Sequence, residues 1–236
     1  LLASLSDGDA RISWVSGGRV GSAANFARGL ARAPRDVDAL LLADQDDVWD
    51  PDKASTLVAA LDAGHMLVHS DARLVDADAT ALPGTLFGHE ARDADATSQG
   101  ALVVRNVVTG CTLALRPRLL DAALPFPSIV GGPVHHDLWL ALCASSIGTI
   151  GTVARPLLDY RQHDANVVGA VTGYGTSQGL RDAIGSWALR RRIAQALVDV
   201  AAAGRLPAPG PDVTAWTGGR PELATRAVLQ QLGQQH

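Results

Sequence analysis

The chain has 236 residues, of which 47% are hydrophobic, 4% aromatic and 19% charged, so it carries enough apolar material for a sizeable core. This composition excludes a predominantly disordered protein. The 20 lysine and arginine residues and 24 aspartate and glutamate residues give a formal net charge of −4, without the basic excess typical of proteins that bind nucleic acid.

The cysteines and the start of the sequence bear on where the chain works. Cys111 and Cys143 are too few for a disulfide framework and lack CxxC spacing, which favours a reducing compartment and a cytoplasmic location. The sequence begins with Leu1, and Met66 is the only methionine, so we expect a fragment or a processed chain. The uncharged stretch at 138–154 contains serine, glycine and threonine, which favours a helix followed by a strand over a membrane span.

Apolar runs alternate with helical patterns through the first two thirds of the chain, which is typical of an α/β domain with a mostly parallel sheet flanked by helices. Each element is placed by its periodicity and by the prolines and caps at its ends. The predicted elements are, in chain order, a strand at 12–15, helix 22–33, strand 38–43, a helix from Asp50 and Pro51 to Ala63, strand 66–70 continued by Leu74 and Val75, an apolar segment of undecided type at 102–108, strand 111–115, helix 136–146, strand 150–153 and helix 180–203.

The last part of the chain differs in composition from the rest. The helix at 180–203 is amphipathic, and the segment from Gly204 onward is rich in proline and glycine, as in a linker. A last short helix is predicted at 223–232. We therefore expect one domain over residues 1–175, followed by a helical extension and tail over 176–236.

An acidic cluster at 43–49 is the strongest local signal. It places Asp44, Asp46 and Asp47 where a buried strand is predicted to end, and loops at the carboxyl ends of strands are common ligand sites in open α/β sheets. Crowded carboxylates repel one another unless a cation is present, and their oxygens suit Mg²⁺ or Mn²⁺, which also bind phosphates. The cluster predicts a divalent-cation site; the alternative is a solvated acidic turn.

Two further polar clusters follow. His136 and Asp137 begin an apolar helix, whose N-terminus favours an ionised carboxylate that could accept a proton from a substrate hydroxyl. The alternative is that Asp137 caps the helix and His136 is a surface residue. In the cluster at 159–169, Arg161 offers a forked donor suited to phosphate, and His163 could bind a metal or a phosphate oxygen, the alternative being a surface histidine.

Taken in order, six short motifs resemble those of the family 2 glycosyltransferases of the GT-A fold, in particular the rhamnosyltransferase-like branch. The resemblance covers roughly residues 11–170, and it is specific because six motifs occur in the right order. The motifs are Gly21 to Phe26, Asp44 to Trp49 with Pro51 and Lys53, Ser70-Asp71 at the end of a strand, Thr109 to Thr112, His136-Asp137-Leu138-Trp139, and Tyr160 to His163 with Asn166 and Gly169.

The resemblance implies a GT-A-like, Rossmann-related sheet and transfer of a sugar, with rhamnose as one candidate, from a nucleotide-diphosphate donor to an acceptor hydroxyl with inversion. It implies a divalent cation, Mn²⁺ or Mg²⁺, held by Asp46, Asp44 and His163. The residues that it assigns to the donor are Asp44, Asp46, Asp47, Asn25, Arg161 and His163.

The resemblance also implies roles on the acceptor side. Asp137 would be the catalytic base, with Thr109, Gly110, His136 and Trp139 near the acceptor, where Trp139 would offer a flat apolar surface to a sugar ring. The acceptor would be a glycan or lipid-linked glycan in cell-surface polysaccharide or glycolipid synthesis. The chain would then work in the cytoplasm, at the inner face of the membrane, with peripheral membrane association.

The sequence departs from the family pattern at its front. Family members begin with two strands, the second ending in a DDGS-like box, whereas Ser6-Asp7-Gly8 has no preceding strand here. We therefore expect a sheet without the first strands and an incomplete nucleotide pocket. Two other functions remain open: a metal-dependent phosphoesterase that uses Asp44, Asp46, His136 and His163, and a non-catalytic module that binds sugar nucleotides or glycans.

Overall fold

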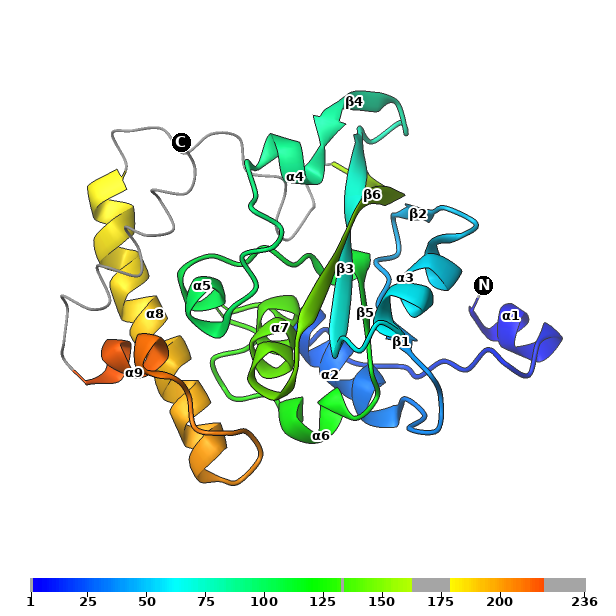
Figure 1. The fold of residues 1–236 in the computed structure, drawn as a ribbon. Coiled ribbons are helices and arrows are strands. Elements are labelled where there is room, and N and C mark those ends of the chain that lie inside the picture. The colour runs from blue at the N-terminus through cyan, green and yellow to red at the C-terminus, as the bar shows by residue number, and fades with distance from the viewer. Residues whose placement is uncertain (1, 133, 163–178, 219–236) are drawn as a thin grey trace.

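A six-stranded sheet lies between helices in the computed structural model, which describes residues 2–132, 134–162 and 179–218 (Figure 1). The strand order is β1-β5-β3-β6-β2, and β4 pairs with β3 beyond β5. The strands are β1 Leu40–Leu41, β2 Val48–Trp49, β3 Leu67–Val75, β4 Ala81–Thr85, β5 Leu113–Leu115 and β6 Ile150–Arg161.

The prediction of a mostly parallel sheet is wrong for the described strands. β3 and β6 pair in parallel, and the other four pairings are antiparallel. β5 accounts for much of the difference, because it enters from the short 3₁₀ turn Gly110–Thr112 and runs antiparallel between β1 and β3. β1, β3 and β6 still point in one direction, so their carboxyl ends share one edge of the sheet.

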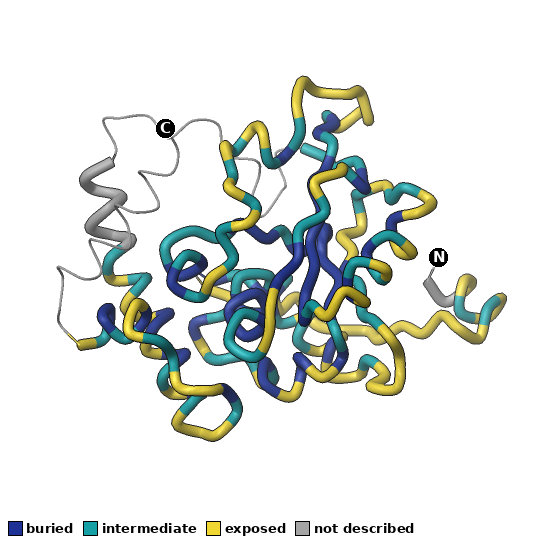
Figure 2. Tube along the Cα trace, in the orientation of Figure 1, coloured by how far each residue is buried: buried dark blue, intermediate teal, exposed yellow. Residues whose placement is uncertain are grey.

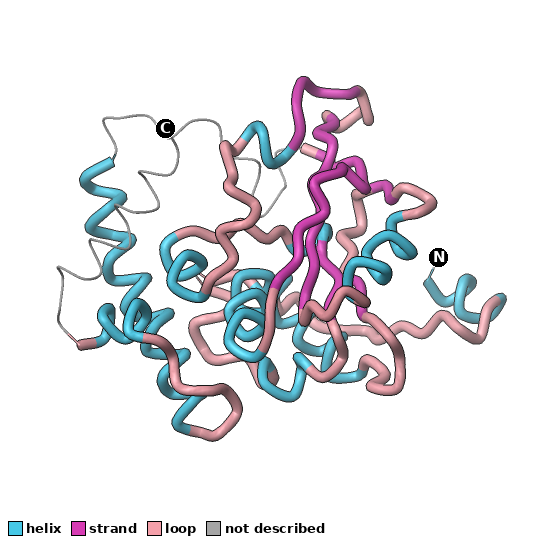
Figure 3. Tube along the Cα trace, in the orientation of Figure 1, coloured by secondary structure: helices cyan, strands magenta, loops and turns pink. Residues whose placement is uncertain are grey.

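Helices pack on both faces of the sheet, as Figure 3 shows. The predicted helices at 22–33, 136–146 and 180–203 are confirmed, and the segment of undecided type at 102–108 contains the end of a helix. The helices are α1 Leu2–Gly8, α2 Ser22–Arg32, α3 Lys53–Leu61, α4 Leu86–His89, α5 Gln99–Val104, α6 Leu119–Ala123, α7 His136–Ile147, α8 Gly179–Ala202 and α9 Pro211–Thr217.

The described core has one large cluster and two small ones, the second small one being Ala72, Leu74, Leu86, Cys111 and Leu158. The large cluster joins side chains of the sheet to those of α2, α5, α6, α7, α8 and α9, with α7 at its centre. The first small cluster packs Leu57 and Leu61 of α3 against Val68, Ala114 and Leu157. Figure 2 shows the buried strands in the middle of the molecule, where both faces are covered. This burial holds the ends of the strands in place.

The predicted strand at 12–15 is not present. These residues run as a loop, and the side chains of Ile12, Trp14 and Val15 are exposed. A strand exists only with a hydrogen-bonded neighbour, and the sheet pairings of the described residues provide none for this segment. Its apolar sequence is therefore insufficient by itself to make it a strand.

The helix predicted to begin at Asp50 and Pro51 begins at Lys53 instead. Asp50 does not cap it, because its carboxylate pairs with Arg73 of β3 at 2.5 Å. Arg73 also contacts Asp159 of β6 at 2.5 Å, so one guanidinium ties together the chain segments on three neighbouring strands. The hydrogen bond from Arg73 holds the pKa of Asp50 below its usual value.

Arg73→Met is expected to lower the free energy of unfolding at pH 7 by about 1 kcal/mol, because the ion pairs that it removes are only partly buried. Since the pKa of Asp50 is lowered in the folded state, the stabilisation is present above the pKa of the unfolded carboxyl and is lost as the pH falls through the folded one. Urea unfolding at pH 7 and pH 3 measures both. Arg155→Met, which breaks an exposed pair with Asp52, should cost only a few tenths of that value, and an equal loss in both variants would contradict the expectation.

The segment after Gly204 was predicted to be linker-like, yet it contains α9, which begins with a proline at its first turn. Val213 and Trp216 of α9 are buried, and the Trp216 ring lies 4.7 Å from that of Trp187 on α8. The helix predicted at 223–232 lies outside the described residues. None of the described helices is long and apolar enough to cross a membrane.

Candidate active site

The acidic loop follows β1 at the carboxyl edge of the sheet, as predicted. Asp44 is exposed, whereas Asp46 and Asp47 are half-buried, and the chain then enters β2. Ligand atoms of Asp44, Asp47 and Cys111 lie within 4.8 Å of one another. The structure therefore groups Asp44 with Asp47, and Asp46, which the sequence paired with Asp44, is outside this group.

Cys111 is the residue of this group that sequence reasoning missed. It lies in the turn Gly110–Thr112 and is completely buried beside the loop. The resemblance assigns Thr109 and Gly110 of its motif to the acceptor and gives Cys111 no role, and no local pattern shows that β5 enters the sheet next to β1. A thiol and two carboxylates form a mixed ligand set, which includes the oxygen ligands that Mg²⁺ and Mn²⁺ prefer.

Partial desolvation and repulsion between like charges raise the pKa values of two carboxyls in the acidic loop, those of Asp44 and Asp47. Partial desolvation raises the pKa of Asp44 to about 6, and the charges of Asp47, Asp46 and Asp137 add to this effect. Desolvation also raises the pKa of Asp47, while the Cys111 thiol and the backbone N–H of Arg161 oppose the rise. A cation between these carboxylates would reverse the shifts, because it favours their charged form.

The acidic loop also fits a cation by its hydrogen bonding. Oδ1 of Asp47 accepts a hydrogen bond from the Arg161 N–H at 3.2 Å. Its other oxygen, Oδ2, is buried and has no hydrogen-bond partner among the described residues. An orphaned carboxylate oxygen is costly unless a ligand, ion or water satisfies it. Asp44 and Asp47 therefore have the chemistry and the spare capacity to hold a divalent cation.

Arg161 fixes the acidic loop in the structure. Its Nε donates to the Asp46 carbonyl at 3.0 Å, and its Nη1 donates to the Ala77 carbonyl at 2.7 Å. These contacts, with its backbone bond to Asp47, join the end of β6 to the loop. His163, which the sequence assigned to the donor and the metal, lies outside the described residues.

Asp137 is in the first turn of α7, as predicted, and is half-buried. Its Oδ1 accepts a hydrogen bond from the Leu138 N–H at 2.6 Å. Asp137 packs against the turn that holds Cys111, since a Cβ on Gly110 would lie 3.7 Å from Cβ of Asp137, and Cys111 is grouped with Asp44 and Asp47. The structure thus brings the predicted base near the predicted cation site.

His136 is buried against Gly110 and stacks on Phe26 of α2, with ring centroids 3.8 Å apart. Neither ring nitrogen has a hydrogen-bond partner among the described residues. Burial lowers the pKa of His136, so the ring is neutral at pH 7. The alternative of an ordinary surface histidine does not apply.

Asn25, which precedes Phe26 on α2 and which the resemblance assigns to the donor, is exposed. It lines a hollow of about 340 Å³ beside β1.

Gly110 is required where α7 approaches the turn. A Cβ on it would lie 2.6 Å from Nε2 of His136 and 3.7 Å from Cβ of Asp137. Gly110→Ala should therefore displace the start of α7 and lower the free energy of unfolding by about 1–3 kcal/mol, measured by urea unfolding. Gly29→Ala, in the middle of α2 with open space around it, is the control, and it should leave stability unchanged or slightly raised. Equal stability of both variants would contradict the close approach.

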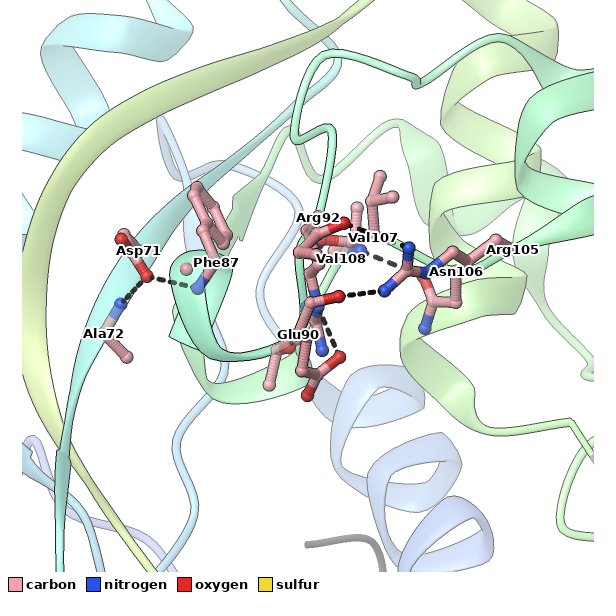
Figure 4. Close-up of polar contacts among 12 residues, drawn as sticks. Asp71, Ala72, Phe87, Glu90, Arg92, Arg105, Asn106, Val107 and Val108 are labelled. Carbon is pink, nitrogen blue, oxygen red and sulfur yellow. Dashed lines mark hydrogen bonds and ion pairs between the residues drawn. The ribbon is translucent and has the colours of Figure 1, made fainter. Parts of the chain in front are cut away.

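Thr109 is held by the chain segment between α4 and α5, through the side chain of Arg92. Nη1 of Arg92 donates to the Thr109 hydroxyl at 2.7 Å, while Nε of Arg92 pairs with Glu90 at 2.7 Å. Figure 4 shows Arg92 beside Glu90, with Arg105 contacting the backbone carbonyl of Glu90. These contacts fix the chain that leads into the Gly110 turn.

Asp71 and Trp139 lie in surroundings that differ from those expected from the sequence. Ser70-Asp71 does not end its strand, because β3 continues to Val75; instead, Oδ1 of Asp71 accepts hydrogen bonds from the N–H groups of Ala72 and Phe87 (Figure 4). Trp139 presents no surface to an acceptor, because it is completely buried and its Nε1 donates to the Ala123 carbonyl at 3.0 Å. Its ring belongs to the core under α7.

No family model and no curated protein sequence matches the chain. Among solved structures, the fold is similar to that of S. aureus TarS 1–349, whose crystal structure was determined in complex with UDP-GlcNAc. The TM-score is 0.52 and the sequence identity 12%, over 91% of this chain and 56% of that chain. This chain thus spans little more than half the length of its structural neighbour. At this identity the likeness concerns the fold, which is GT-A-like.

Proposed function

We propose that the chain is a nucleotide-sugar glycosyltransferase. The observation that carries the proposal is the group of Asp44, Asp47 and Cys111 at the carboxyl edge of a GT-A-like sheet, with Asp137 packed against Gly110 of the same turn as Cys111. Such a site offers carboxylates for two tasks: some hold a cation and its phosphates, and another accepts a proton. Binding of UDP-GlcNAc by the structural neighbour supports a nucleotide-sugar donor, whose sugar is left open.

On the donor side, Asp44 and Asp47 would hold a divalent cation, with Asp46 beside them. The cation, when bound, supplies positive charge that neutralises the departing diphosphate. Arg161 keeps the loop in place through its contacts to Asp46 and Asp47. The DxD pair Asp44 and Asp46, the cation ligand His163 and the donor contact Asn25 follow from the motif resemblance and remain parts of the proposal.

On the acceptor side, Asp137 would take the proton from the acceptor hydroxyl while that oxygen attacks the anomeric carbon with inversion. Oδ1 of Asp137 is engaged by the Leu138 N–H, which orients the carboxylate and leaves Oδ2 for the proton. Gly110 packs against Cβ of Asp137 and against the His136 ring, Thr109 precedes it in the chain, and the unsatisfied nitrogens of His136 are suited to a hydroxyl of the acceptor.

The finer parts of the proposal rest on the order of the six motifs. They favour the rhamnosyltransferase-like branch, with a glycan or lipid-linked glycan as the acceptor in cell-surface polysaccharide or glycolipid synthesis. In that setting the chain would act in the cytoplasm, at the inner face of the membrane, by peripheral association.

The test is a panel of nucleotide sugars, including dTDP-rhamnose and UDP-GlcNAc, measured for binding by calorimetry with and without Mn²⁺. We expect at least one donor to bind, and to bind more tightly with Mn²⁺. Failure of every nucleotide sugar to bind in either condition would refute the proposal. Hydrolysis of a simple phosphate ester in the same buffers would instead favour the phosphoesterase, although the cation group of the described residues contains no histidine.

A further inference from the structure

Lys53 is a completely buried cation directly behind the acidic loop. It is the first residue of α3, and its Nζ donates to the Cys111 carbonyl at 2.6 Å. The same Nζ lies 3.6 Å from the centroid of the Trp49 ring. The ammonium group is thereby fixed between the end of the acidic loop and the Gly110–Thr112 turn, with no access to solvent.

The charge of Lys53 acts on the two carboxylates that would hold a cation. Burial lowers the pKa of Lys53 to about 8, while Asp47 and Asp44 oppose this shift, so the side chain is mostly charged at pH 7. The ammonium group is close to the two carboxylates, because its Nζ donates to the carbonyl of Cys111, whose thiol lies within 4.8 Å of ligand atoms of Asp44 and Asp47. The acidic group is therefore already partly neutralised from within the protein.

A fixed positive charge beside a cation site has a definite consequence. A divalent cation that enters between Asp44 and Asp47 is attracted by the carboxylates and repelled by Lys53. The repulsion is stronger than in water, because the effective dielectric constant near a partly buried site is about 20 rather than 80. A diphosphate that enters with the cation supplies negative charge, which offsets the repulsion.

We propose that Lys53 makes cation binding at Asp44 and Asp47 depend on the diphosphate of the donor. The bare cation binds weakly, and the cation together with a nucleoside diphosphate binds well. This inference rests on the proposed function, because it assumes a diphosphate ligand, and it gives Lys53 a positioning role that acts through the charge at the acidic loop. Binding of the two ligands is then coupled, and each improves the affinity for the other by the same factor.

The experiment measures Mn²⁺ binding by calorimetry at pH 7.5, with and without UDP, for the wild type and for Lys53→Met. Methionine has a similar length and no charge, so it should be tolerated in the buried position. We expect UDP to tighten Mn²⁺ binding by the wild type at least about tenfold, and Lys53→Met to tighten binding of Mn²⁺ alone at least about tenfold, with a correspondingly smaller effect of UDP.

Arg118→Gln is the matched control for the loss of one positive charge. Arg118 is exposed next to α6, which follows β5 at the opposite edge of the sheet, so the Kd for Mn²⁺ should stay within about twofold. Lys53→Gln is the second variant, since its amide can still donate to the Cys111 carbonyl without a charge. Melting temperatures show which variants are folded.

The outcomes separate the inference from the proposed function. An unchanged or weaker affinity for Mn²⁺ alone in the folded Lys53 variants would show that Lys53 is only a structural contact. Equal Mn²⁺ affinity of the wild type with and without UDP would overturn the coupling even if both variants fail to fold. If no nucleoside diphosphate binds, while Lys53→Met still tightens Mn²⁺ binding, the proposed function fails and the electrostatic role of Lys53 stands.

Discussion

Asp137→Asn is expected to lower the rate of sugar transfer by about 10²–10⁴-fold, which is the usual contribution of a positioned general base. Asparagine has the same shape and can still accept the hydrogen bond from the Leu138 N–H, so α7 should keep its start. Donor binding should change little, because only the proton acceptor is lost. Steady-state kinetics with a donor from the panel, together with calorimetric donor binding, measure the two effects.

The control for this variant is Asp121→Asn, which removes an exposed carboxylate from the first turn of α6. It should leave both transfer and donor binding unchanged. Transfer by Asp137→Asn at the rate of the wild type would remove Asp137 from the catalytic role. A loss of donor binding as large as the loss of rate would assign it to the donor instead.

Asp47→Asn is expected to weaken Mn²⁺ binding by at least about tenfold, because even the loss of a group that only supports a metal ligand costs 10–100-fold. Asp47 is chosen because its Oδ2 is buried and has no hydrogen-bond partner among the described residues, so it is available to a cation. Asp46→Asn should have a smaller effect, since Asp46 lies outside the group of ligand atoms. Calorimetry with Mn²⁺, alone and with UDP, compares the two variants directly.

This pair of variants decides between two assignments. A larger loss in Asp46→Asn than in Asp47→Asn would restore the pairing of Asp44 with Asp46 that the sequence suggests. The wild-type affinity should also fall as the pH drops through about 6, because Asp44 then binds a proton that competes with the cation. An affinity that is constant from pH 5 to pH 8 would argue against Asp44 as a ligand.

Much of the fold follows from local sequence patterns. The helix at 136–146 and the strand before the acidic loop were predictable because each is a nearly continuous apolar run whose length and flanking residues suit one element type. The direction of β5 was not predictable, because the sequence of its three residues, Leu113–Leu115, does not indicate with which strands they pair. The strand predicted at 12–15 failed for the same reason: pairing depends on distant residues.

The candidate site, like the fold, was predictable from the sequence only in part. The position of Asp44 to Asp47 at the end of a strand was predictable, and so was the position of Asp137 at the start of a helix. The proximity of Cys111 to Asp47 was not, since it depends on where β5 enters the sheet. Trp139 was misassigned because a helix apolar on nearly every face gives no indication of which aromatic ring stays exposed, and here the ring is inside.

Because of the position of β5, the candidate site can form only when the sheet around this strand is complete. Leu115 pairs with Leu40 on one side and with Leu67 on the other, so three distant parts of the chain must meet before the Gly110–Thr112 turn can lie beside the acidic loop. Contacts of such high sequence separation form slowly, and a partly folded chain lacks them. Ligand affinity is thus thermodynamically linked to the global unfolding equilibrium, and Mn²⁺ with a nucleoside diphosphate should raise the melting temperature of the whole domain.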